Sequence, residues 1–155
     1  MSENAKKPRI RFKGFTDAWE QRKLGEIATI LKGEQINKSK LSTTGRYYVL
    51  NGGMTPSGYT DTYNTKADTI SISEGGNSCG FVNYNFVPFW SGGHNYTLIN
   101  PKIDAKFLYQ ILKYIEPKIM SLRVGSGLPN VQKSRLSEVE VSFSSDNEQS
   151  TIGKY

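Results

Sequence analysis

The pattern of hydrophobic and polar residues along the chain predicts several short strands. Residues 69–73 (TISIS) alternate cleanly between apolar and hydroxyl side chains, which predicts a strand, and residues 138–143 (EVEVSF) alternate in the manner of a half-buried strand. Other short segments, rich in β-branched and aromatic residues, predict further strands between loops that contain Gly, Asn and Pro. These segments are 24–31, 46–50, 81–90 (one or two strands) and 96–99.

The same pattern predicts one clear helix, over about residues 104–116. Asp104 is a suitable N-cap, and Pro117 is expected to close the segment because proline cannot continue helical hydrogen bonding. The spacing of the apolar residues is typical of an amphipathic helix. The apolar face is formed by Phe107, Leu108, Ile111, Leu112 and Ile115.

Two further helical segments are predicted towards the C-terminus. Ser134 is expected to cap a single helical turn that runs through Leu136. Asp146 and Gln149 have the spacing of a capping box, which predicts the start of a last helix over 146–155. Together these elements predict an α+β protein, rich in short, irregular strands that are separated by long loops.

The length of 155 residues is enough for one domain with a hydrophobic core. We expect a polar, disordered tail over residues 1–8, a single domain over 9–145 and the beginning of a helix over 146–155. No apolar run approaches the length of a membrane span, and the charged N-terminus has no apolar signal region, so the chain is expected to be cytoplasmic. Trp19 and Trp90 are expected to lie in the core.

The chain carries a net charge of +6, which is unevenly distributed. Residues 1–40 contain ten Lys or Arg and five Asp or Glu, and residues 105–155 contain seven and five. The middle, 41–104, contains three and four and is rich in Gly, Asn, Ser, Thr and Tyr. Lysine and arginine bind phosphates, whereas directed polar groups and the backbone read base edges. This distribution fits a protein that reads a DNA sequence, and it also fits a basic tail on an ordinary domain.

The sequence offers no convincing catalytic or metal-ligating residues. Cys79 is the only cysteine and His94 the only histidine, so we expect neither a zinc site nor a catalytic triad. Asp104 and 116–118 (EPK) match the pattern of metal-dependent nucleases superficially, but they would lie about 18 Å apart along the predicted helix. Residues 100–103 (NPKI) lack the full amino-methyltransferase motif, which is Asn/Asp-Pro-Pro-aromatic.

Three glycine pairs, at 52–53, 75–76 and 92–93, punctuate the polar middle of the chain. Such pairs either make tight turns or let backbone amides approach DNA closely, and the loop at Gly75 is the main candidate for contact. Tyrosines in polar loop sequence are candidates for stacking on bases. The residues that we expect to contact DNA are Gly52, Gly53, Tyr59, Tyr63, Glu74, Gly75, Gly76, Asn77, His94, Asn95, Ser126, Asn130, Lys133 and Arg135.

Two stretches of the chain carry a resemblance to a known family. The first, 8–27 (PRIRFKGFTDAWEQRKLGEI), is basic and contains aromatic residues and a tryptophan. The second, 124–155, combines a Gly- and Ser-rich loop, a short turn that ends in Leu, a strand and the pattern Glu148-Gln149-x-x-Ile152. Together they resemble the specificity (S) subunits of type I restriction–modification systems, especially those of Gram-positive bacteria.

This resemblance implies one target recognition domain followed by the first turns of the family's spacer helix. It implies binding to double-stranded DNA without catalysis by the chain itself. Glu148, Gln149 and Ile152 would help to bind the methylation (M) subunit, and the restriction (R) subunit would complete the complex. S-adenosylmethionine, ATP and Mg²⁺ would bind to those partner subunits. A single domain of this kind would be expected to pair with itself or with a second half-subunit.

Glu74 departs from the family pattern, because many relatives have a basic residue at this position. It either accepts a hydrogen bond from a cytosine amino group or faces solvent. Two other functional classes fit the sequence as well. One is the recognition part of a single-chain restriction–methylation enzyme, and the other is a protein-interaction module whose positive charge is incidental.

Overall fold

The structure is a computed structural model that describes residues 19–143. The predictions for 1–8 and 146–155, including Glu148, Gln149 and Ile152, lie outside the described residues. The strands are β1 (Glu20–Lys23), β2 (Thr29–Lys32), β3 (Tyr47–Leu50), β4 (Gly58–Thr60), β5 (Thr69–Ser73), β6 (Val82–Asn85), β7 (Trp90–Ser91), β8 (Asn95–Ile99) and β9 (Glu140–Phe143). The helical segments are α1 (Leu24–Ile27), the 3-10 turn η2 (Lys38–Lys40), α2 (Ala105–Tyr114), α3 (Glu116–Met120) and α4 (Lys133–Ser137).

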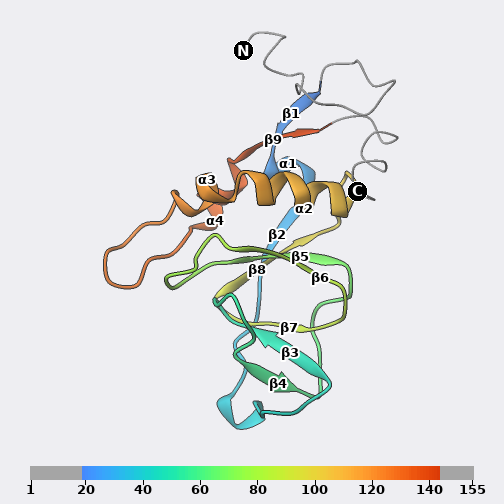
Figure 1. Ribbon diagram of the computed structural model, residues 1–155, viewed down its shortest axis with the longest axis vertical. Helices are drawn as coiled ribbons and strands as arrows, with labels where there is room; N and C mark the ends of the chain where they lie inside the picture. Colours follow the sequence, from blue (N-terminus) through green and yellow to red (C-terminus); the bar gives the residue numbers. More distant parts are fainter. Residues whose placement is uncertain (1–18, 144–155) are drawn as a thin grey trace.

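A four-stranded sheet forms the centre of the fold, with strand order β2-β8-β5-β6 and antiparallel pairing throughout. Ile70 on β5 lies opposite Leu98 on β8 and Tyr84 on β6. Because side chains alternate along a strand, this register places large apolar residues of three strands on one face. The helices cover that face, and a three-stranded sheet, β4-β3-β7, lies on the other side (Figure 1). The α+β, strand-rich architecture is therefore confirmed.

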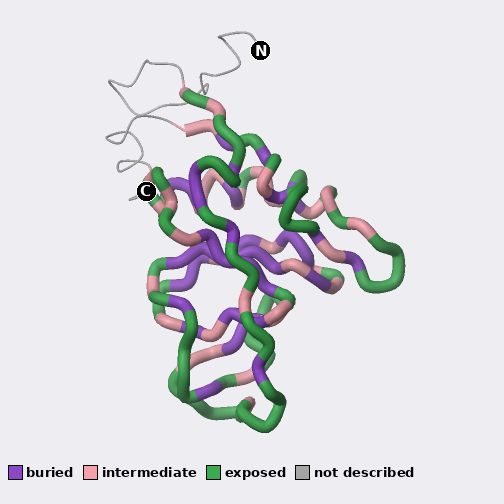
Figure 2. Tube along the Cα trace, turned by 180° about the vertical axis from the view of Figure 1, so that it is seen from behind, coloured by how far each residue is buried: buried purple, intermediate pink, exposed green. Residues whose placement is uncertain are grey.

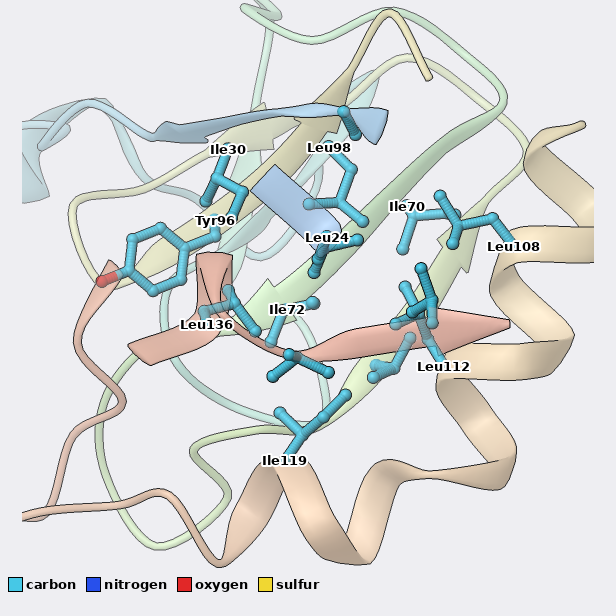
Figure 3. Packing of buried hydrophobic residues seen from close by; sticks show 14 of the residues in the cluster. Leu24, Ile30, Ile70, Ile72, Tyr96, Leu98, Leu108, Leu112, Ile119 and Leu136 are labelled. Atoms are coloured by element: carbon cyan, nitrogen blue, oxygen red, sulfur yellow. The ribbon is translucent and has the colours of Figure 1, made fainter. Parts of the chain in front are cut away.

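The hydrophobic core lies between the apolar face of this sheet and the helices. Ile72 of β5, Leu112 of α2 and Ile119 of α3 are completely buried, and they belong to one cluster with Leu24 and Leu136. Figure 3 shows the side chains of the sheet and of the helices pointing towards one another. Full burial of such a side chain contributes about 1.5–3 kcal/mol, so this face holds the helices on the sheet.

The predicted helix over about 104–116 and its cap are confirmed in α2. Asp104 Oδ1 accepts a hydrogen bond from the backbone N–H of Phe107 at 2.8 Å. α2 ends before Pro117, as expected, but a short helix that was not predicted, α3, follows it. Pro117 lies in the first turn of α3, where its missing N–H has no helical partner to lose. Glu116, at the start of α3, accepts a hydrogen bond from the backbone N–H of Val82 at 2.8 Å, which ties the bend to β6.

The opposite face of the four-stranded sheet is also buried, but it is polar. Ser71 on β5 and Asn85 on β6 are both buried, and Asn85 Nδ2 donates to Ser71 Oγ at 2.9 Å. Tyr48 on β3 donates to Asn85 Oδ1 at 2.6 Å, which joins this face to the three-stranded sheet. The strand predicted at 69–73 is confirmed as β5, and every one of its residues is buried.

The prediction of one strand over 24–31 is wrong in its first half. α1 begins at Leu24 and turns both Leu24 and Ile27 into the core, and β2 follows at Thr29. Ser134 does not cap α4 either. The N-cap is Gln132, so Ser134 lies inside the helix.

Neither tryptophan is a core residue, contrary to prediction, because both are only partly buried. Trp90 Nε1 donates to the backbone carbonyl of Glu34 at 2.9 Å, which is a surface contact between β7 and the segment after β2. Trp19 packs edge-on against Phe107 with 5.5 Å between the ring centroids. Both rings thus cover buried structure from outside.

Candidate nucleic-acid interface

Each of the three glycine pairs begins within two residues of the end of a strand. Gly52 comes after β3, Gly75 after β5 and Gly92 after β7. β3 and β7 pair in parallel, so their C-terminal ends lie at the same edge of the three-stranded sheet. The strand ends therefore bring glycine turns from distant parts of the sequence together.

At Gly52 and Gly92 the turns pack too closely for a larger residue to fit without displacing its neighbours. A Cβ atom on Gly52 would lie 3.1 Å from His94 Cβ and 3.2 Å from the carbonyl oxygen of Gly75. A Cβ atom on Gly92 would lie 2.5 Å from Asn51 Oδ1. Gly52 also has a φ of 88°, in the left-handed region that favours glycine. The glycine pairs thus make tight turns, as expected, and they also let the loops at residues 51–53, 75–76 and 92–94 approach one another closely.

Backbone hydrogen bonds attach the turn at Gly75 to its neighbours. The N–H of Glu74 donates to the carbonyl oxygen of His94 at 3.0 Å. The carbonyl oxygen of Glu74 in turn accepts from the N–H of Val131 at 2.8 Å. The N–H of Gly76 donates to the carbonyl oxygen of Pro129 at 2.9 Å. The turn is therefore held between the start of β8 and the loop that follows α3. Figure 2 shows that loop as a projection that is mostly exposed.

These segments enclose a pocket of about 290 Å³. Four separate parts of the chain contribute to it, which makes it a product of the tertiary fold. Its lining residues are Asn51, Gly52, Glu74, Gly75, Gly76, His94, Leu128, Pro129 and Asn130. Six of these residues were predicted from the sequence to contact DNA: Gly52, Glu74, Gly75, Gly76, His94 and Asn130.

Sequence reasoning missed Asn51, Leu128 and Pro129 in this lining. Asn51 could have been found, because Asn-Gly is a strong turn signal and Asn51 precedes a predicted contact. Its Oδ1 accepts from the backbone N–H of His94 at 2.9 Å, which fixes two of the loops to each other. Nothing in the local sequence distinguishes Leu128 and Pro129 from ordinary loop residues.

Glu74 is the charged centre of the pocket. Its side chain is 13% exposed, so the alternative that it simply faces solvent is wrong. Glu74 Oε2 lies 3.2 Å from His94 Nδ1, and Oε1 lies 3.7 Å from Lys32 Nζ. Because an ionised carboxylate only accepts hydrogen bonds, the contact with His94 requires a hydrogen on Nδ1. The carboxylate of Glu74 in the pocket therefore has two neighbouring nitrogen donors, of which His94 lines the pocket and Lys32 does not.

Tyr96, on β8, bonds to the segment that follows Asn130 of the pocket lining. Its hydroxyl donates to the backbone carbonyl of Val131 at 3.0 Å, beside the loop that carries Asn130. Burial, with a smaller contribution from the charge of Glu74, raises the pKa of Tyr96 above its ordinary value. The hydroxyl thus remains a donor at neutral pH and keeps the loop attached to β8.

Several other predicted contact residues lie outside the pocket lining. Gly53, Asn77, Ser126, Lys133 and Arg135 are exposed, with Ser126 in the projecting loop and the two cations on α4. Their exposure leaves them available to a ligand.

Tyr59 and Tyr63 belong to a different part of the surface. Tyr59 lies on β4 opposite Tyr48, and the ring of Tyr63 packs edge-on against Tyr47 at 5.0 Å between centroids. Both are exposed, by 37% and 51%, at the three-stranded sheet. They do not join the pocket lining.

Asn95 does not fit the predicted role. It is only 3% exposed, and its Nδ2 donates to Ser91 Oγ at 2.9 Å inside the polar layer between the sheets. Strand alternation explains the error, because His94 precedes the strand and points outward whereas Asn95 is the first residue of β8. Asn95 is a structural residue behind the pocket.

Within residues 19–143, no group of His, Cys, Asp and Glu side chains is arranged to hold a metal ion. In the same part of the chain, no helix is long and apolar enough to cross a membrane. The arrangement at the pocket is suited to binding through hydrogen bonds and charge.

Comparison with known sequences gives a consistent result. A family model described as the type I restriction modification DNA specificity domain matches residues 16–155. A Mycoplasma genitalium protein named as a type I specificity subunit is 38% identical over 138 residues, which are 86% of this chain and 36% of that protein. A Mycoplasma pneumoniae protein with a similar name is 38% identical over 126 residues, 79% of this chain and 33% of that protein. The chain spans about a third of the length of these relatives.

Solved structures share the fold. The crystal structure of a type I restriction–modification S subunit from M. genitalium matches with a TM-score of 0.88 and 34% identity, over 95% of this chain and 40% of that one. The HsdS subunit from Thermoanaerobacter tengcongensis matches with a TM-score of 0.68 over 96% of this chain and 38% of that one. Its identity of 19% makes it evidence for the fold alone.

Proposed function

Because the chain belongs to the type I restriction modification DNA specificity domain family, we propose that it acts as one target recognition domain of a type I specificity subunit. It reads one half of a split target in double-stranded DNA and brings the methylation and restriction subunits there. The observation that carries this proposal is the meeting of three glycine turns and the 124–130 loop at one pocket. Backbone and polar groups on loops above a rigid scaffold are suited to reading base edges.

Exposed cations next to the pocket bind the DNA backbone in this proposal. Lys133 and Arg135 lie on α4, soon after the loop that lines the pocket. Neutralising phosphates releases counterions, so the affinity falls as the salt concentration rises. Such contacts position the duplex without reading its sequence, and the pocket residues supply the discrimination. Tyr59 and Tyr63 would meet a second part of the duplex from the three-stranded sheet.

The chemistry of the complex belongs to its other subunits in this proposal. The methylation subunit supplies S-adenosylmethionine and methyl transfer, and the restriction subunit supplies ATP hydrolysis and Mg²⁺-dependent cleavage. Glu148, Gln149 and Ile152 bind the methylation subunit as part of a spacer helix. A second recognition domain or half-subunit reads the other half of the target, and the complex works in the cytoplasm. The chain itself is not an enzyme.

Mapping of methylated DNA tests this function directly. The chain is co-purified with its cognate methylation subunit, and the sites that the complex methylates are read by sequencing. Residues 74–80 and 124–130 are then exchanged for the corresponding loops of the M. genitalium relative. We expect the exchanged complex to assemble and to methylate a different half-site. An unchanged methylated sequence, or turnover by the purified chain alone, would contradict the proposal.

The cations on α4 are tested separately. Lys133→Ala and Arg135→Ala should weaken binding about equally for all duplexes. The slope of log affinity against log salt should fall by about 1 for each phosphate that the variant no longer neutralises. Lys118→Ala, which removes an exposed lysine from α3, is the matched control. Unchanged affinity of the α4 variants at low salt would place these cations away from the phosphates.

A further inference from the structure

One acidic side chain lies at the centre of an interface that otherwise requires positive charge. Glu74 is the only Asp or Glu among the residues that line the pocket. A carboxylate repels phosphate, so Glu74 opposes DNA binding unless it meets a hydrogen-bond donor. We propose that Glu74 determines specificity by accepting a hydrogen bond from the exocyclic amino group of one base. This inference rests on the proposed function and names the base chemistry that the pocket accepts.

The chemistry of the major groove limits what Glu74 can bind. Cytosine N4 and adenine N6 are amino donors there, whereas guanine O6 and N7 and thymine O4 are acceptors. An ionised carboxylate offers only acceptors. Glu74 therefore attracts the amino group of cytosine or adenine, and it repels the edges of guanine and thymine. One carboxylate is enough to separate the four bases into two classes at one position.

The carboxylate keeps acceptor capacity for a ligand. Within the described residues, its one hydrogen bond joins Oε2 to His94 Nδ1 at 3.2 Å. Oε1 lies 3.7 Å from Lys32 Nζ, which is an ion pair longer than a hydrogen bond. A carboxylate has about four lone-pair positions, so positions remain for an amino group. Lys32 and His94 meanwhile offset the cost of enclosing the charge.

The surroundings of Glu74 keep it both rigid and accessible. Its backbone is bonded on both sides, to His94 and to Val131, so the carboxylate does not move with a loose loop. A Cβ atom on Gly75 would lie 3.7 Å from His94 Nδ1, in ordinary van der Waals contact, and Gly75 itself places no side chain against the groups around the carboxylate. The glycine thus leaves an opening through which a base edge can approach the acidic group.

Apolar residues complete the wall of the pocket. Leu128 is 77% exposed and stands on the projecting loop, and the buried Pro129 follows it. When duplex DNA covers Leu128, water is excluded from the neighbourhood of the carboxylate. A hydrogen bond strengthens and an unmatched polar group becomes more costly as the local dielectric falls. The apolar wall therefore increases the discrimination that Glu74 makes between donor and acceptor edges.

The test removes the donor and the acceptor one at a time. The wild-type complex of this chain and its methylation subunit is used to map the methylated sequence. Duplexes of that sequence are then prepared in which single adenines are replaced by deoxynebularine, or single cytosines by the pyrimidin-2-one nucleoside. Both analogues lack only the exocyclic amino group. Binding is measured for the wild type, Glu74→Gln and Glu74→Ala, with Glu20→Gln as a matched control on the exposed surface of β1.

We expect one position at which loss of the amino group weakens wild-type binding by about 5- to 150-fold. Glu74→Ala should show no further loss at that position, and its methylated sequence should become degenerate there and nowhere else. The analogue that produces the effect tells whether the base is cytosine or adenine. Glu74→Gln keeps the shape of the side chain and one acceptor oxygen but adds an amide donor, so it should reduce the discrimination between donor and acceptor edges at that position, which provides a test if the alanine variant is unstable. Glu20→Gln should behave as the wild type.

The inference and the proposed function fail in different ways. If both Glu74 variants keep the wild-type methylated sequence and every wild-type sensitivity to amino loss, Glu74 does not read a base, although the domain still recognises DNA. If the wild-type complex shows no sequence preference, or if the loop exchange leaves the methylated sequence unchanged, the proposed function itself is wrong.

Discussion

The two faces of the four-stranded sheet are both buried, yet they are built from different chemistry. On one face, Ile70 and Ile72 of β5 pack against the helices in a cluster of apolar side chains. On the other face, Ser71 of β5 meets Asn85 and Tyr48 in a hydrogen-bonded layer between two sheets. The same five-residue strand supplies both.

This difference separates stability from positioning. Apolar burial is strong but not directional, whereas hydrogen bonds require particular distances and angles. The polar layer lies between β5 and β3, and these strands lead directly into the turns that carry Glu74 and Gly52. Ser73 Oγ even donates to the carbonyl oxygen of Gly75 at 3.3 Å. We infer that the apolar face holds the domain together and that the polar face fixes the strand ends that form the pocket.

Truncation of a residue on the apolar face should give the largest loss of stability. Ile72 is completely buried, so Ile72→Ala should lower the free energy of unfolding by about 2–5 kcal/mol through reduced burial and a new cavity. Urea unfolding followed by circular dichroism measures this change. Leu31→Ala, at a position that is 53% exposed on β2, is the control and should have little effect. A small loss for Ile72→Ala would remove the basis of the comparison.

Truncation of a residue on the polar face should lower the free energy of unfolding by less than Ile72→Ala does. Asn85→Ala leaves the Tyr48 hydroxyl and the Ser71 hydroxyl without their Asn85 partner, and a buried group left unsatisfied costs about 1–3 kcal/mol. A double-mutant cycle with Tyr48→Phe, read by urea unfolding, isolates the bond between the two side chains. We expect coupling between these sites. Additive effects would mean that the polar layer does not act as a network.

The two faces also differ in how well the sequence predicts them. The apolar face follows from periodicity, because the spacing of Phe107, Leu108 and Leu112 on α2 matches a helix that buries one side. The polar face cannot be predicted in this way, since serine and asparagine, as at Ser71 and Asn85, are residue types typical of an exposed strand surface. Their burial depends on a second sheet that pairs β3 with β7 across some forty residues, and no local pattern contains that pairing.

The candidate site was partly predictable for a related reason. Glycine pairs and the single histidine stand out in the sequence, and the structure brings Gly52, Gly75 and His94 to one pocket. Asn95 was misplaced because the strand boundary decides which of two neighbouring residues faces outward. Leu128 joins the pocket only through the loop after α3, whose path is set by backbone bonds to the turn at Gly75. Composition thus finds turns, and tertiary structure decides which turns meet.

A substitution at the pocket rim sharpens the link between the polar face and the loops. Gly52 has a φ of 88° and touches His94, so Gly52→Ala should lower the free energy of unfolding by about 1–2 kcal/mol and displace the neighbouring turns. DNA binding should weaken more than this loss of stability explains. Gly127→Ala is the matched control, because a Cβ atom there would meet nothing within 4 Å. Equal effects of the two variants would show that close packing of the turns is unimportant.

The smallest expected effect is a dependence on alkaline pH that involves the polar face. Burial raises the pKa of Tyr48 above the usual tyrosine value of about 10. A raised pKa in the folded state means that this contribution to stability is complete below about pH 10 and is lost as the pH rises through the folded-state pKa. The hydroxyl then ionises and can no longer donate to Asn85.

Unfolding by urea at a series of pH values from neutral to alkaline measures this effect. In Tyr48→Phe, the fall in stability above about pH 10 should be shallower than in the wild type, because one tyrosine with a raised pKa has been removed. Tyr84, on the apolar face, also has a raised pKa, through burial and the nearby charge of Asp68, so part of the alkaline loss should remain. If Tyr48→Phe leaves the alkaline profile unchanged, the hydroxyl is not confined in the layer between the sheets, and the polar face cannot hold β3 and β5 in the way that the pocket requires.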